Sequence, residues 1–191
     1  MLALALIIER FISLRSSKIV PASLLSEVLS VTRTSVPPAD VVNHLEQNSA
    51  LGEVLASGLR ALNSNPRCSE PELRAVMEGT GRLVAHRLER YLSALATIAS
   101  AAPLMGLFGT VVGMIEIFGA QIPTGGNPAQ LAHGISVALY NTAFGLVIAI
   151  PSLVVWRYLR AKVDNFVVEL EIAAERMVHH FFAQRTAVSA P

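Results

Sequence analysis

Two long apolar runs of this 191-residue chain contain polar side chains, and three of these, Thr110, Asn141 and Thr142, lie on or beside stripes of small residues. Hydroxyl and amide groups in apolar helices have two uses. They bond to their own or a neighbouring helix, which stabilises by only about 0.6 kcal/mol on average, or they line a polar path through a membrane. Both interpretations stay open from spacing alone.

Small residues accompany these polar groups at steps of three and four, so each set forms one face of a helix. The first stripe is Ala99, Pro103, Gly106, Thr110 and Gly113, and the second is Ala138, Thr142, Gly145, Ala149 and Ser152, with Asn141 beside it. Small faces let helix backbones approach closely in a membrane. The residues predicted to serve helix packing are Pro103, Gly106, Gly109, Gly113, Gly145, Ala149 and Pro151.

One carboxylate, Glu116, ends the first apolar run. At a bilayer centre a carboxylate would indicate function, but at the end of a run it lies near the interface, where ionisation costs little. We interpret Glu116 as an interfacial acid on the outer side, with proton entry as the alternative.

The two apolar runs predict membrane-spanning helices. The first lies between Arg90 and Glu116 and holds about 25 residues, or roughly 37 Å of helix. The second extends from Gly134 to Trp156, about 23 residues, against the ~20 needed to cross a bilayer core. Composition agrees, because 52% of the chain is hydrophobic and only 15% is charged.

The distribution of positive charge predicts the topology. Arg and Lys flank both runs on one side, and the connector from Gly119 to His133 contains neither. The positive-inside rule therefore places the connector outside, with residues 16–90 and the C-terminal tail in the cytoplasm. The net charge of +1 does not indicate a nucleic-acid partner. The single Cys68 is expected to be a free structural thiol in the cytoplasmic part.

The N-terminal segment, residues 1–15, has only eight apolar residues before Glu9, about 12 Å of helix and too short to span. It lacks the basic start and the small-residue cleavage site of a signal peptide. We interpret it as the inner half of a first transmembrane helix whose start was assigned too far downstream. The alternative is a short helix whose surroundings thin or tilt.

The remainder predicts cytoplasmic helices. Helical spacing is expected over Ala22–Thr32 and again over Ala39–Leu62. Ser69 and Glu72 form a capping box that starts a helix expected to run unbroken into the membrane. The predicted class is an all-α integral membrane protein with three transmembrane helices. Its segments are 1–15 (first transmembrane helix, inner half), 16–90 (cytoplasmic), 91–118 (second transmembrane helix), 119–133 (periplasmic connector), 134–156 (third transmembrane helix) and 157–191 (cytoplasmic helical tail).

Catalytic signatures are absent from the sequence. It contains no P-loop, no nucleophile elbow and no His/Cys set with metal-ligand spacing. The adjacent His179 and His180 point to different faces of a helix and are interpreted as a solvated helix end. We therefore expect no enzyme activity, no cofactor and no metal.

The two runs carry a resemblance. LATIASAAPLMGLFGTVVGMIEIF and GISVALYNTAFGLVIAIPSLVVWRYLR resemble the paired membrane helices of the MotA/TolQ/ExbB proton channel family, ExbB-like. The patterns APLxGLFGTVxGM and TAxGLxxAIP are specific to it, and IIERFxxLR resembles the inner end of its first helix. The resemblance covers nearly the whole chain and is weakest in the cytoplasmic segment.

This resemblance implies a homo-pentameric ring in the bacterial inner membrane, surrounded by membrane lipid. The ring would enclose helices of an ExbD- or TolR-like partner that carries a titrating aspartate, and a TonB- or TolA-like protein would transmit the motion to the outer membrane. Ring threonines matching Thr110 and Thr142 would face the interior, with Asn141 as a further pore-wall residue. The transported ion, H⁺ or Na⁺, is left open.

One departure from the family pattern weakens part of this expectation. The usual context GIxEAL reads GISVALYNTA here, so Val137 replaces the family glutamate. An in-ring carboxylate relay therefore does not carry over. The leading expectation is an energiser of TonB-dependent transport. The alternatives are a Tol-Pal or motility energiser of the same family, or a non-conducting membrane scaffold.

Overall fold

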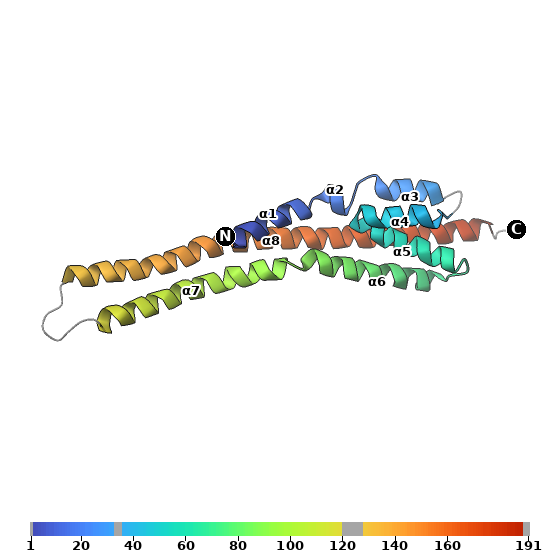
Figure 1. Ribbon diagram of the computed structural model, residues 1–191. Helices are drawn as coiled ribbons and strands as arrows, with labels where there is room; N and C mark the ends of the chain where they lie inside the picture. Colours follow the sequence, from blue (N-terminus) through green and yellow to red (C-terminus); the bar gives the residue numbers. More distant parts are fainter. Residues whose placement is uncertain (1, 33–35, 120–127, 189–191) are drawn as a thin grey trace. The chain divides into compact units, whose positions relative to one another are not determined.

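The computed structural model describes residues 2–32, 36–119 and 128–188, and in these residues every regular element is a helix (Figure 1). The helices are α1 (Leu2–Ser13), α2 (Ser16–Ile19), α3 (Leu24–Thr32), α4 (Ala39–Asn48), α5 (Ala50–Ser64), α6 (Glu70–Glu89), α7 (Leu92–Gly119) and α8 (Pro128–Val188). The predicted all-α class is confirmed.

The chain divides into two compact units. Unit 1 comprises residues 1–10 and 91–159, and unit 2 comprises residues 11–90 and 160–191. Helix α8 belongs to both units, whereas α6 lies wholly in unit 2 and α7 wholly in unit 1.

Unit 2 has a conventional hydrophobic core. Helix α5 lies at its centre, packs against α4 and α6, and buries one apolar side completely. The core includes Leu51, Leu55, Leu59, Leu73, Met77, Leu170 and Met177, all at most 3% exposed. Burial of side chains of this size contributes about 1.5–3 kcal/mol each, so the unit holds together through ordinary water exclusion. Cys68 keeps its thiol, which is buried in this core and donates to the carbonyl of Ser69 at 3.5 Å, in agreement with the predicted structural role.

The helix expected over Ala39–Leu62 is two helices. Ser49 is extended, with φ −161° and ψ 166°, and separates α4 from α5. Its hydroxyl accepts a 3.0 Å hydrogen bond from the backbone N–H of Gly52, which is an N-cap. The apolar periodicity continued through this cap, so periodicity alone missed the break.

The capping box at the start of α6 is confirmed. The backbone N–H of Ser69 donates to Glu72 Oε2 at 2.8 Å, and the N–H of Glu72 donates to the Ser69 hydroxyl. The helix does not run unbroken into the apolar segment as expected, because α6 ends at Glu89 and α7 begins at Leu92. At this point the N–H of Arg90 turns to the carbonyl of Arg87, a tighter bond that ends the α-helical ladder.

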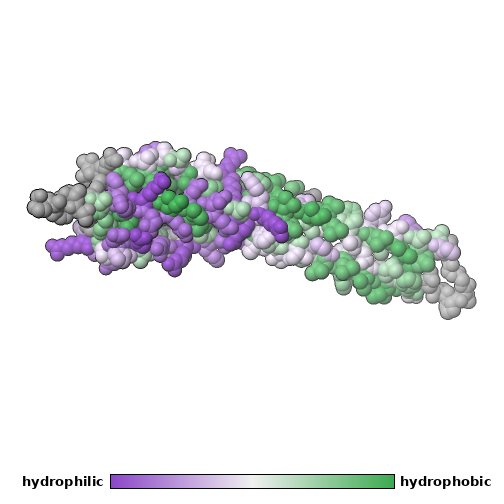
Figure 2. Space-filling view, turned by 180° about the vertical axis from the view of Figure 1, so that it is seen from behind, coloured by the Kyte–Doolittle hydropathy of each residue, from purple (hydrophilic) through white to green (hydrophobic). Residues whose placement is uncertain are grey.

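Unit 1 contains apolar helices most of whose side chains are not buried. Both stretches predicted to span the membrane are long and apolar enough to do so, and only 11% and 22% of their most apolar windows are buried. Leu104, Phe108, Phe144 and Val147 are each 66–69% exposed. A soluble core helix would bury such residues, so these surfaces fit lipid or other apolar partners. Figure 2 shows hydrophobic residues over unit 1 and hydrophilic ones gathered over unit 2.

Helix α8 continues far beyond its apolar part, as expected, and reaches Val188 without a break at Pro151. It begins at Pro128, so residues 128–133 of the expected connector are helical, while 120–127 lie outside the described residues. Helix α1 has 12 residues, and only two helices in the described ranges pass the length and hydropathy test for spanning.

Candidate functional site

The small residues of the two apolar helices lie in one contact between α7 and the first part of α8. A Cβ added at Gly106 would lie 2.7 Å from the backbone oxygen of Asn141, and one at Gly145 would lie 2.6 Å from the backbone oxygen of Ala102. At Gly113 it would lie 3.2 Å from the Cβ of Ala138. These backbones therefore approach too closely for larger side chains, which is the geometry of small-residue helix packing in membranes.

Asn141 and Thr142 lie at the centre of this contact. The Cα of Thr142 faces Gly106, and the side-chain amide of Asn141 covers Gly109, 3.0 Å from the position of an added Cβ. Within the described ranges, neither polar side chain has a hydrogen-bond partner. Both are incompletely buried, so water or a partner chain can reach their polar atoms.

Thr110 lies one turn after Gly106 on α7 and is half-buried. Its hydroxyl donates a 2.7 Å hydrogen bond to the carbonyl of Leu107, in its own helix. It lines a shallow, open hollow with Val111, Met114 and Phe118. The hydroxyl therefore has a satisfied donor and free acceptor lone pairs beside an apolar surface.

The other predicted site residues lie around this contact. Ala149 is buried on α8, Pro103 is half-buried inside α7, and Pro151 is exposed inside α8. Glu116 is exposed near the end of α7, and Val137 is 50% exposed on α8. The structure thus brings together the glycines, Asn141 and Thr142, and leaves Glu116 outside the contact.

Sequence analysis missed a second polar arrangement in unit 1, at Arg10. Its side chain is 6% exposed, its Nε lies 2.5 Å from Glu9 Oε2, and its guanidinium carbon lies 4.6 Å from the centre of the Tyr91 ring. Arginine paired with a carboxylate and stacked on an aromatic face satisfies its charge away from water. In the sequence, Arg10 was only one of several positive charges after an apolar stretch.

Comparison with known proteins extends the resemblance beyond the two motifs. The profile of the MotA/TolQ/ExbB proton channel family matches residues 46–172, which include the whole α7–α8 contact. The chain belongs to this family.

The relatives of this chain include proteins with biopolymer-transport names and one with a Tol-Pal name. The putative biopolymer transport protein ExbB-like 3 of Synechocystis is 31% identical over 80% of this chain and 72% of its own length. The Tol-Pal system protein TolQ of Pseudomonas aeruginosa is 30% identical, over 70% of this chain and 64% of its own. The biopolymer transport protein exbB1 of Vibrio cholerae is 40% identical, over 45% and 39%.

The match to these relatives is uneven in extent. The chain spans about two thirds of the Synechocystis and Pseudomonas relatives and well under half of the Vibrio one. The family is one of proton channels rather than of enzymes. Which energised system the chain serves does not follow from these similarities, because relatives with transport and Tol-Pal names match to a similar degree.

Proposed function

We propose that this chain is a subunit of an inner-membrane proton channel that couples proton-motive force to TonB-dependent transport across the outer membrane. Membership of the proton channel family supports this proposal. The apolar and largely exposed surfaces of α7 and α8 also support it, because they require lipid or neighbouring helices to cover them.

The partner in this proposal is an ExbD- or TolR-like chain inside a homo-pentameric ring, and it supplies the titrating acid. The two apolar runs contain no Asp or Glu between Leu92 and Ile115 or between Gly134 and Trp156. Val137 stands where the family pattern has a glutamate. The subunit then provides a polar wall through Thr110, Asn141 and Thr142, and residues 16–90 and the C-terminus lie in the cytoplasm.

Two polar side chains in the α7–α8 contact support the proposal that this subunit forms part of the pore wall. Asn141 and Thr142 lie beside Gly106, where the two helix backbones approach closely, and their side-chain polar atoms have no partner in the described part of the chain. A polar group without a partner in an apolar setting is unfavourable, by about 1–3 kcal/mol in mutational data, unless water or another chain pairs with it. A hydrated path or a partner helix removes that cost.

Proton flux into vesicles tests the proposal. The chain and an ExbD-like partner are reconstituted together, and Thr110→Val and Thr142→Val are compared with the parent. Both variants keep side-chain size, so loss of flux with the assembly intact supports the wall role. Ser136→Ala is the matched control, because this exposed α8 hydroxyl bonds to the carbonyl of Ala132 and lies outside the contact.

A non-conducting scaffold is the second candidate, and Val137 favours it because the in-ring carboxylate is missing. Absence of flux in the parent protein, with the partner retained and its aspartate intact, would support the scaffold and contradict the channel. A Tol-Pal or motility role of the same machinery would show in which partner chain co-purifies.

A further inference from the structure

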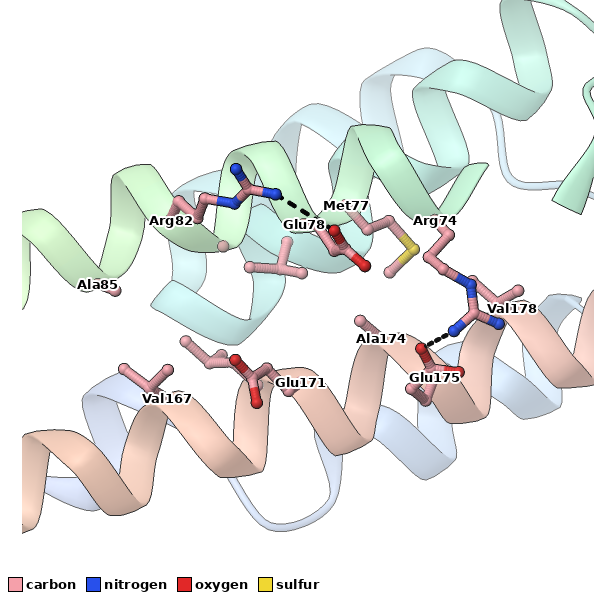
Figure 3. Close-up of a pocket in the computed structure, with 13 residues that line it drawn as sticks. Arg74, Met77, Glu78, Arg82, Ala85, Val167, Glu171, Ala174, Glu175 and Val178 are labelled. Carbon is pink, nitrogen blue, oxygen red and sulfur yellow. Dashed lines mark hydrogen bonds and ion pairs between the residues drawn. The ribbon is translucent and has the colours of Figure 1, made fainter. Parts of the chain in front are cut away.

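A groove lies between α6 and α8 within unit 2 (Figure 3). Its volume is about 460 Å³, and its floor is apolar, with Met77 from α6 and Leu170 and Val178 from α8. Ion pairs border it: Arg74 with Glu175 across the groove, and Arg82 with Glu78 along α6 at 3.3 Å. An apolar floor with a charged rim is the usual anatomy of a protein–protein contact.

The groove exists because small residues stand where the two helices face each other. Gly81, Ala85 and Ala174 line it. A Cβ added at Gly81 would meet no atom within 4 Å, so the space beside this glycine is unfilled by the chain itself. Side chains of another molecule can enter here without displacing the groove walls.

The same helix carries an apolar stripe on its other flank. Leu83 is 67% exposed and Val76 is 43% exposed, with the exposed Gly79 between them. At about 100° per residue, Leu83 and Val76 lie roughly 160° and 140° around the helix from Gly81, in the same rotational sense. Unit 2 therefore presents an apolar stripe on one side of α6 and an apolar groove on the other.

Stripe and groove also lie at the same level along α6. Leu83 is two residues from Gly81, a rise of about 3 Å. The antiparallel register of α8 is fixed by the pairs Arg74–Glu175 and Glu89–Arg160, which are 15 residues apart on both helices (89 − 74 and 175 − 160). This register puts Val167, which lines the groove, beside residue 82.

We propose that the α6–α8 groove of unit 2 receives the Val76–Leu83 stripe of a second copy of this chain. A contact between two different surfaces is heterologous, so each copy leaves one stripe and one groove for further copies. Equal levels along α6 let such contacts close into a ring about an axis parallel to α6, whereas an offset would produce a helical filament. The inference rests on the proposed ring and assigns the extramembrane surfaces that join its subunits.

Site-directed cross-linking between two tagged copies tests this contact. Both copies carry Cys68→Ala to remove the native thiol; one then carries Leu83→Cys and the other Val167→Cys. They are co-expressed as full chains in membranes and treated with a short bis-maleimide. We expect mixed-tag dimers, and a ladder ending at the ring size when one chain carries both substitutions.

Two controls make the result specific. In the first control, Val41→Cys replaces Leu83→Cys. Val41 is also an exposed apolar residue but lies on α4, so it should give little mixed-tag product with Val167→Cys. Gly81→Leu in the Val167→Cys copy fills the groove and should abolish most of the cross-linking. Because the site has open space and leucine is a better helix former than glycine, this variant is expected to fold.

Failure of this inference can be distinguished from failure of the proposed function. Native mass spectrometry of the same chains reports whether a ring forms. If a ring forms without Leu83–Val167 cross-links, or with Leu83–Leu83 cross-links alone, the assignment of these two surfaces is wrong, while the proposed ring is retained. Cross-linking of Val167→Cys to the co-expressed partner chain instead of a second copy also overturns it. A monomer in both assays overturns the ring and this contact together.

Discussion

Helix α8 meets two different partners, and glycine has opposite roles in the two contacts. Against α7, Gly106 and Gly145 lie so close to backbone atoms of the other helix that an added Cβ would overlap them. In the contact between α8 and α6, a Cβ added at Gly81 of α6 would have no atom within 4 Å. One contact uses glycine to bring backbones together, and the other uses it to leave a groove.

The surroundings explain the difference. Next to α7, the outward side chains are apolar and need no water, so helix association depends on close van der Waals packing. In unit 2, a core of leucines and methionines already holds α5, α6 and α8 together by excluding water. The α6–α8 contact can therefore stay incompletely filled at one flank.

The largest expected effect is at Gly106. Gly106→Ala puts a methyl group 2.7 Å from the Asn141 oxygen and 3.0 Å from the Thr142 Cα, and neither backbone can move away without separating the helices. Overpacking costs about 1–3 kcal/mol, of which about 1 kcal/mol is offset by alanine's better helix propensity. Faster amide hydrogen exchange in α7 and the first part of α8 should follow. Gly119→Ala, at an open glycine of α7, is the matched control.

A smaller effect of opposite sign is expected at Gly81. Gly81→Ala should stabilise α6 by about 0.5–1 kcal/mol, because alanine loses less backbone entropy and its methyl meets no atom. Slower hydrogen exchange over α6 would show it. Gly58→Ala provides the contrast inside the same unit, since its Cβ would lie 2.8 Å from the Met77 sulfur. Equal effects at both positions would contradict the comparison.

The smallest expected effect concerns acid stability at the start of α6. The backbone N–H and the hydroxyl of Ser69 hold the pKa of Glu72 below its ordinary 4.5. A lowered folded-state pKa contributes stability above the unfolded pKa that is lost as pH falls through the folded value. The thermal midpoint of unfolding should therefore fall less steeply in Glu72→Gln than in the parent as the pH is lowered below 4.5. Circular dichroism in detergent measures this midpoint. Glu169→Gln removes an exposed charge outside any cap and should leave the decline unchanged.

Much of the fold could be predicted from local patterns. The apolar runs, the capping box at Ser69 and the long extension of α8 all depend on residues within a few turns of one another, and the structure contains each. The interruptions at Ser49 and at Arg90 could not be predicted in this way. Apolar spacing continues across both, so periodicity alone marks neither break.

The candidate site divides similarly. The small stripes and their polar residues were visible in the sequence, because a helix places every third or fourth residue on one face. That Asn141 covers Gly109 and that Arg10 stacks on Tyr91 depend on which helices meet and at what rotation. The α6–α8 groove depends on the same relation between distant segments.

The sequence by itself determined helix type, the apolar spans, family membership and the absence of carboxylates within the two runs. Those properties follow from composition and from periodicity along one chain segment. Only the tertiary structure decided which glycines lie against a neighbouring backbone and which border open space. Identical residues at identical helical spacing differ here only in what lies opposite them, and that is a property of the packed pair of helices.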